Sequence, residues 1–121
     1  LKAIAPSAPF LNDYRDYFAL VDWPGNWILQ AAQEQNIPVE ELYVTLSYFD
    51  VKNFTDRIQC PVLMAIGLQD PVCPPHTNFA GFNHIKAEKS WICYPEAGHN
   101  VWEQKGWPEA KQKFLDSFLW E

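Results

Sequence analysis

The clearest pattern along the chain is a continuous apolar run over Pro61–Gly67, closed by a glycine. Such runs are typical of strands that are buried on both faces, as in parallel sheets. A second strand is predicted over Lys89–Tyr94. The short apolar segment Leu1–Ala5, which ends at Pro6, fits a third buried strand.

Helices are predicted wherever apolar residues recur at helical spacing. The strongest pattern covers Trp107–Trp120, where Pro108 suits the first turn. Another helix begins near Pro38 and presents Leu42, Leu46 and Phe49 on one face. Three more helices are predicted. A short one is capped by Asn12 or Asp13 and runs through Val21, with Tyr14, Phe18 and Val21 at helical spacing. Another covers Asn26–Gln35, and the last covers Thr77–Ile85 with Phe79, Ala80 and Phe82 as its apolar positions.

The order of elements indicates the fold class. Strand, helices, strand, helix, strand, helix is the order of an α/β layer with a parallel sheet and right-handed crossovers. Asp50–Ile58 reads as a polar linker with Phe54 as its one apolar anchor, and nothing divides residues 1–121 into two domains.

Three strands make a small sheet, and Leu1–Ala5 would lie at its open edge with unpaired backbone groups. The sequence begins at Leu1, and Met64 is its one methionine. We therefore expect the chain to be the C-terminal portion of a larger α/β domain. Its N-terminal half would be missing here or supplied by another chain.

Charge narrows the classes of partner. The 121 residues include 9 Lys and Arg against 15 Asp and Glu, a formal net charge of −6. Nucleic-acid binding is not expected, because affinity for a phosphate backbone comes from clustered basic residues. No apolar run approaches the roughly 20 residues that cross a bilayer, and no signal-peptide pattern opens the sequence. The sequence leaves the cellular location open.

Two polar residues follow neighbouring predicted strands. Asp70 comes three residues after Gly67, and His99 comes five residues after Tyr94. Because function in open α/β sheets collects at the carboxyl ends of the strands, we expect both side chains at the same edge. A carboxylate that orients a general-base histidine needs this placement. The alternative interpretation is that Asp70 is a solvated turn residue and His99 an ordinary surface histidine.

The chain order of these two residues matches part of a known pattern. In α/β hydrolases the catalytic triad runs serine, acid, histidine, and Asp70 followed by His99 gives its last two members. No Gly-x-Ser-x-Gly motif occurs in the 121 residues. The nucleophile is therefore expected outside this chain.

Several stretches of the chain carry a resemblance to a known family: Ala5–Leu11, Leu46–Phe54 (LSYFDVKNF), Cys60–Pro75 (CPVLMAIGLQDPVCPP), Thr77–Ala80 and Tyr94–His99 (YPEAGH). They resemble the acetyl xylan esterase / cephalosporin C deacetylase family, whose members are serine esterases of the α/β-hydrolase fold. The resemblance spans nearly the whole chain and matches the C-terminal part of the family.

This resemblance implies that Asp70 is the triad acid and His99 the triad base, with Phe10 and Val72 near the acyl pocket. It implies hydrolysis of acetyl esters of xylan or xylo-oligosaccharide with no metal or organic cofactor, and assembly into a homo-oligomer. Members commonly continue with Glu-Gly-Gly after the histidine. This chain instead reads Asn100-Val101-Trp102, which is a departure from the pattern.

Two other functions remain open at this stage. The chain could be a non-catalytic binding or assembly module that keeps the hydrolase fold, or part of another acyl hydrolase such as a peptidase or a dienelactone hydrolase. By itself the chain is expected to be inactive, because it lacks the nucleophile.

Other side chains suit structural roles. Cys60, Cys73 and Cys93 match no zinc-binding spacing and are expected to be free thiols. His76 and His84 are eight residues apart, which is not the spacing of a helical metal pair. Four tryptophans, Trp23, Trp27, Trp102 and Trp107, are expected in the core or at a subunit interface.

Overall fold

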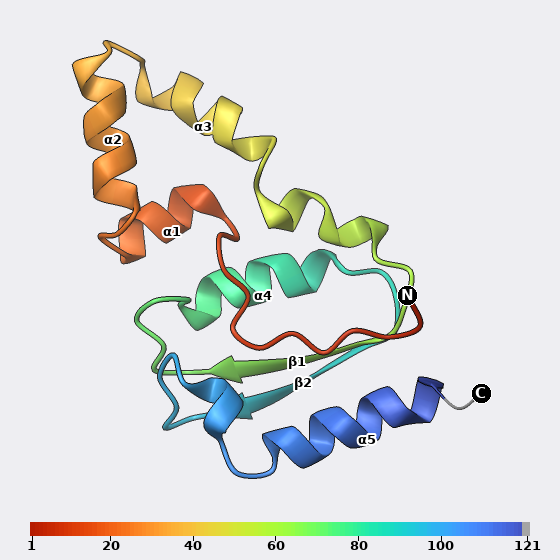
Figure 1. Ribbon diagram of the computed structural model, residues 1–121. Helices are drawn as coiled ribbons and strands as arrows, with labels where there is room; N and C mark the ends of the chain where they lie inside the picture. The colour runs from red at the N-terminus through yellow and green to blue at the C-terminus, as the bar shows by residue number, and fades with distance from the viewer. Residues whose placement is uncertain (120–121) are drawn as a thin grey trace.

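The computed structural model describes residues 1–119. It shows two parallel strands with helices around them (Figure 1). Strand β1 covers Val62–Gly67 and pairs in parallel with β2, Lys89–Tyr94, in a register that sets Val62 beside Lys89 and Gly67 beside Tyr94. The predicted strands over Pro61–Gly67 and Lys89–Tyr94 are confirmed.

The predicted third strand over Leu1–Ala5 is wrong as a regular strand. The N-terminal segment runs parallel to β1 on the side away from β2, through isolated bridges between Ile4 and Val62 and between Ser7 and Ala65. Pro6 has no N–H to donate, so the ladder on this side is interrupted. Its carbonyl still accepts from the Ala65 amide at 3.0 Å, and the segment keeps the place of an edge strand.

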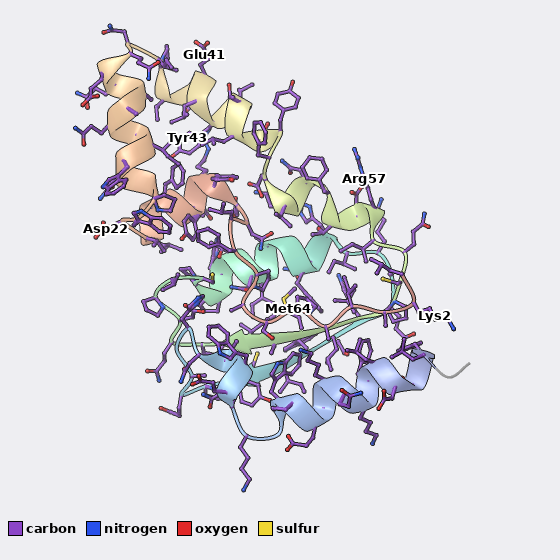
Figure 2. All side chains as sticks on the ribbon, viewed as in Figure 1. Lys2, Asp22, Glu41, Tyr43, Arg57 and Met64 are labelled. Carbon is purple, nitrogen blue, oxygen red and sulfur yellow. The ribbon has the colours of Figure 1, made fainter. Side chains whose placement is uncertain are left out.

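Two helices cover opposite faces of the strands (Figure 1). They are α4, Pro75–His84, and α5, Trp107–Leu119. Alternate residues of β1 point to the two faces, so Val62, Met64 and Ile66 pack with Phe82 and Ile85 below α4 (Figure 2). Leu63 and Ala65 pack on the other face with Trp107 and Val101. This two-sided burial explains the continuous apolar run in the sequence.

The remaining helices form an arm that extends from the strand layer (Figure 1). They are α1, Tyr14–Leu20, α2, Gly25–Glu34, and α3, Val39–Ser47. Tyr14, Tyr17 and Phe18 form their own small core. Phe49 was predicted on the apolar face of α3, but it lies beyond the end of that helix and is 67% exposed.

Between the arm and β1, the segment that was predicted as a polar linker forms two short 3₁₀ helices, η1 (Val51–Asn53) and η2 (Thr55–Arg57). Asp50 and Thr55 in this segment are buried. A third 3₁₀ helix, η3 (Val101–Glu103), precedes α5. The α5 prediction is confirmed through Leu119, and its last residue, Trp120, lies outside the described residues.

Three more expectations can be compared with the structure. All three cysteines are free thiols, as predicted. Trp107 is buried, but Trp23, Trp27 and Trp102 are exposed in the chain and are not core residues. No helix in the part of the chain that the structure describes is long and apolar enough to cross a membrane.

Candidate active site

Asp70 and His99 meet at the carboxyl edge of the two strands, as their positions in the sequence predicted. His99 Nδ1 lies 3.0 Å from Asp70 Oδ2. Because an ionised carboxylate can only accept, Nδ1 is the donor in this contact, and in the neutral imidazole that tautomer leaves Nε2 as an acceptor. Within residues 1–119, Nε2 has no hydrogen-bond partner. The Asp70 side chain is fully buried, whereas that of His99 is 39% exposed.

The second oxygen of Asp70 is held by the backbone of its own loop. Oδ1 accepts from the amides of Val72 and Cys73, each at 2.8 Å. An aspartate that binds the amides two and three residues ahead is ordinary turn chemistry. The alternative interpretation of Asp70 as a solvated turn residue is therefore right about the turn, but wrong about the solvation, because the side chain is buried. The turn hydrogen-bonds Oδ1 of Asp70 and orients Oδ2 toward His99.

The loops after β1 and β2 are tied together by backbone hydrogen bonds. The Leu68 amide donates to the Tyr94 carbonyl at 3.1 Å, and the Gln69 amide donates to the Ala97 carbonyl at 3.0 Å. The Gln69 side chain adds a bond to the Pro95 carbonyl at 3.1 Å. These bonds fix the two loops relative to each other and set the position of His99 against Asp70.

The loop of residues 68–74 after β1 carries Asp70 and is called the acid loop here. Tyr17, in α1, braces this loop, and the sequence analysis missed it. Its ring is fully buried, and its hydroxyl donates to the Val72 carbonyl at 3.0 Å. Burial, with smaller effects of Cys73 and Asp70, raises the pKa of Tyr17 to about 12. The hydroxyl thus stays a donor. Its signal was its spacing, three residues after Tyr14 on the same helix face.

The two residues that the family resemblance put near an acyl pocket both contact Tyr17. Val72 belongs to the acid loop itself, and its side chain packs partly buried against the core on the α5 side. Phe10 is 38% exposed. It meets Tyr17 edge to face at 5.8 Å and stacks on Trp23 at 6.2 Å between ring centroids.

Trp102 contacts the histidine directly. Its ring meets the His99 imidazole edge to face, with centroids 5.2 Å apart and an interplanar angle of 88°. Sequence reasoning expected this tryptophan in a core or an interface. The structure excludes the core, because Trp102 lies beside the Asp70–His99 pair with 46% of its surface exposed.

Among residues 1–119, two groups of side chains have donor atoms close enough to hold a metal ion. In the first, Cys73 joins Asp70 and His99, with one donor atom from each residue within 4.8 Å of the others. Burial, and then the charge of Asp70, raises the pKa of Cys73 to about 12. The neutral thiol that results is a poor metal ligand and a poor nucleophile.

The second group is Asp13, Asp16 and His76. His76 Nε2 lies 2.6 Å from Asp16 Oδ2, and both of these side chains are at least half exposed. Asp13 also forms an ion pair with Lys52. His84 belongs to neither group.

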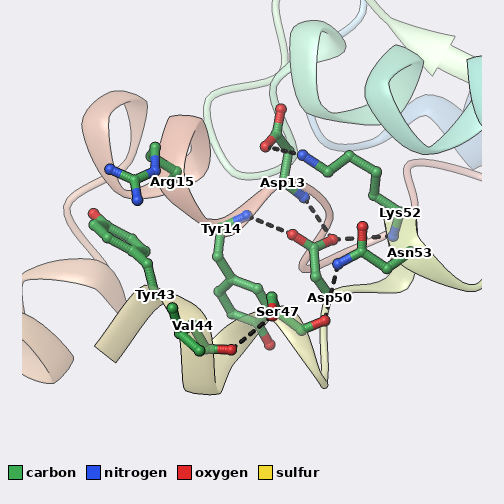
Figure 3. Close-up of a pocket in the computed structure, with 9 residues that line it drawn as sticks. All are labelled: Asp13, Tyr14, Arg15, Tyr43, Val44, Ser47, Asp50, Lys52 and Asn53. Carbon is green, nitrogen blue, oxygen red and sulfur yellow. Dashed lines mark hydrogen bonds and ion pairs between the residues drawn. The ribbon is translucent and has the colours of Figure 1, made fainter. Parts of the chain in front are cut away.

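A separate pocket lies between the arm and η1 (Figure 3). Buried Asp50 lies at its base and accepts from the backbone amides of Asp13 and Tyr14 at 2.9 and 3.0 Å, and from that of Lys52 at 3.0 Å. Its carboxylate therefore caps α1 from a distant part of the chain. Asp13, predicted as a cap, occupies the cap position, but its side chain makes no capping bond. The residues of this pocket therefore hold the start of α1 against η1.

Comparison with known proteins shows the family of the chain. The acetyl xylan esterase (AXE1) family matches residues 1–117. The chain belongs to the acetyl xylan esterase family. It is 40% identical over 65 residues to the acetyl esterase Axe7A of Xylanibacter ruminicola, an alignment that covers 54% of this chain and 15% of that protein.

Two solved structures from this family resemble the whole chain. Acetyl xylan esterase 1 from Thermoanaerobacterium sp. aligns over 98% of the chain, with a TM-score of 0.87 and 31% identity. The acetyl xylan esterase from Paenibacillus sp. R4 also aligns over 98%, with a TM-score of 0.83 and 36% identity. The chain spans 38% of the length of each. Its fold is thus a part of the α/β-hydrolase fold of these esterases.

Proposed function

We propose that the protein that contains this chain is a serine esterase that removes acetyl groups from acetylated xylan or xylo-oligosaccharides, with Asp70 and His99 as triad acid and base. The observation that carries the proposal is the 3.0 Å contact between His99 Nδ1 and the buried Asp70 carboxylate. Membership of the acetyl xylan esterase family supports the substrate class.

In the proposed reaction, His99 Nε2 takes the proton of a serine hydroxyl as the serine oxygen attacks the acetyl carbonyl. The imidazolium then gives that proton to the sugar oxygen as its bond to the acetyl carbon breaks, so the sugar leaves as an alcohol and an acetyl-serine ester remains. Water, activated by the same nitrogen, releases acetate and frees the serine. Asp70 holds the imidazole tautomer and stabilises its charged form. No step needs a metal or an organic cofactor.

The serine comes from another part of the protein in this proposal, because the 121 residues contain no Gly-x-Ser-x-Gly motif. The chain then supplies the C-terminal portion of a single α/β-hydrolase domain and is inactive alone. The N-terminal segment supports this arrangement, because within residues 1–119 it bridges to β1 alone and leaves an edge with which further strands could pair. A homo-oligomer stays a prediction.

The test is acetate release from acetylated xylo-oligosaccharide by the full-length protein. His99→Ala and Asp70→Asn should each lower kcat at least about 1,000-fold. The matched control is His84→Ala, because His84 is an exposed histidine at the end of α4. This variant should stay within about twofold of the wild type, as surface changes usually do.

Other outcomes point to the alternatives. A wild-type protein that folds but releases no acetate from any ester would favour a non-catalytic assembly module. Hydrolysis of other acyl compounds without acetyl esters would favour another acyl hydrolase. Full activity of His99→Ala would overturn the assignment of the base.

A further inference from the structure

We propose that Trp102 forms a binding surface for the sugar ring of the leaving alcohol. The inference rests on the proposed esterase function and adds a residue that selects the alcohol side of the ester. Two observations carry it together. Trp102 contacts the His99 ring at 5.2 Å between centroids, and 46% of its surface is open to solvent.

The position of Trp102 is fixed by its short helix. Its neighbour Val101 is fully buried in the core on the α5 side. The amides of Glu103 and Gln104 donate to the Asn100 and Val101 carbonyls at 3.0 and 3.2 Å, which closes the turn. Trp102 therefore projects from an anchored element, and an aromatic surface held this way loses little conformational freedom when a ligand binds.

The chemistry of the step requires the sugar to lie near this ring. His99 Nε2 gives its proton to the oxygen of the leaving alcohol, so that oxygen must come within hydrogen-bond reach of Nε2. The sugar carbon is one bond further on. Trp102 flanks the same imidazole, so we infer that its exposed surface lies within reach of a sugar ring attached there. A xylopyranose carries its hydroxyls around its rim and exposes C–H groups on its faces, which suits contact with an aromatic ring.

Other exposed aromatic side chains lack this placement. Trp27 on α2 is 71% exposed, and it forms no aromatic pair with another described residue. Phe10 and Trp23 stack on each other beside Tyr17. Of the described rings, Trp102 is the one paired with His99.

The experiment compares two acetyl esters in the full-length protein. One is monoacetylated xylobiose, and the other is ethyl acetate, whose alcohol has no ring. Trp102→Ala should raise KM for acetylated xylobiose about tenfold and leave kcat/KM for ethyl acetate within about twofold. Trp102→Phe should recover most of the loss. The control Trp27→Ala, which removes an exposed tryptophan from the arm, should change neither substrate.

A second measurement does not depend on turnover. Calorimetric titration with xylobiose should show binding to the wild type and to Trp102→Phe, and a loss of about tenfold in affinity for Trp102→Ala. Equal binding by wild type and Trp102→Ala, or no binding to either, would overturn the proposal. An equal loss of kcat/KM on both esters would also overturn it and make Trp102 a positioning residue for His99.

The two proposals fail in different ways. If the wild type hydrolyses neither ester, the proposed function is wrong, and xylobiose titration still decides whether Trp102 binds sugar. If the wild type and Trp102→Ala hydrolyse acetylated xylobiose equally well, the proposed function stands and the sugar surface is wrong.

Discussion

Gly67 and Gly98 approach each other so closely that a side chain at the first would collide with the backbone of the second. A Cβ at Gly67 would lie 2.5 Å from the Gly98 carbonyl oxygen and 2.7 Å from that of Ala97. Gly67 ends β1 and Gly98 immediately precedes His99. Gly67, the glycine that closes the apolar run, therefore allows the acid loop to approach the loop that carries His99.

Gly67→Ala should therefore damage both stability and activity. The backbone carbonyls cannot retreat without loss of the hydrogen bonds from Leu68 and Gln69 that tie the loops. We expect a loss of about 2 kcal/mol or more in the free energy of unfolding and a lower kcat for acetate release. Urea unfolding and steady-state kinetics of the full-length protein measure the two effects.

Gly98→Ala is the matched control for the stability measurement. An added Cβ at Gly98 has the Gln69 carbonyl oxygen at 3.7 Å as its nearest contact, which is ordinary van der Waals distance. It should cost less than about 1 kcal/mol. Equal losses for the two glycine variants would contradict the argument from close approach.

Tyr17→Phe should loosen the acid loop. The variant keeps the buried ring and removes the hydroxyl that donates to the Val72 carbonyl at 3.0 Å. We expect a loss of about 1 kcal/mol in the free energy of unfolding, because a partly buried carbonyl loses its donor, and a modest fall in kcat. Tyr14→Phe is the comparison, because the Tyr14 ring is also buried in α1 but its hydroxyl has no partner within residues 1–119. A larger effect at Tyr14 would refute the assignment of Tyr17 as the brace.

Alkaline pH should destabilise the protein through Cys73. Burial raises its pKa from the ordinary 9.0 to about 12, so the folded state favours the neutral thiol. The contribution is complete below pH 9.0. It declines as pH rises toward 12, because the unfolded chain loses its proton first. Tyr17, with its pKa raised from 10.0 to about 12, adds to the decline in the same direction.

The urea midpoint measured between about pH 8 and about pH 10.5 should fall less steeply for Cys73→Ala than for the wild type. The same variant should still release acetate at near the wild-type rate, because a neutral thiol is no nucleophile. An unchanged slope would argue against the raised pKa, and loss of acetate release with an intact fold would give Cys73 a part in catalysis.

The sequence by itself determined the elements whose physics is local. β1 follows from its continuous apolar run, because both of its faces are buried, and β2 follows from the apolar content of its own segment. α5 follows from its apolar residues at helical spacing. It also determined that Asp70 and His99 share an edge, since parallel strands deliver their carboxyl ends to one side. The turn that holds Asp70 could also be predicted, because an Asp-Pro pair favours a turn in which the aspartate accepts from the backbone amides that follow it.

Tertiary structure decided what depends on partners distant in the chain. Asp50 reads as a linker residue, yet it caps α1 from 36 residues away, because a buried carboxylate needs amide donors and those donors are unpaired at a helix start. Tyr17 braces Val72 across 55 residues, and Trp102 reaches solvent beside His99. Spacing cannot encode such contacts, because they depend on how separately formed elements pack together.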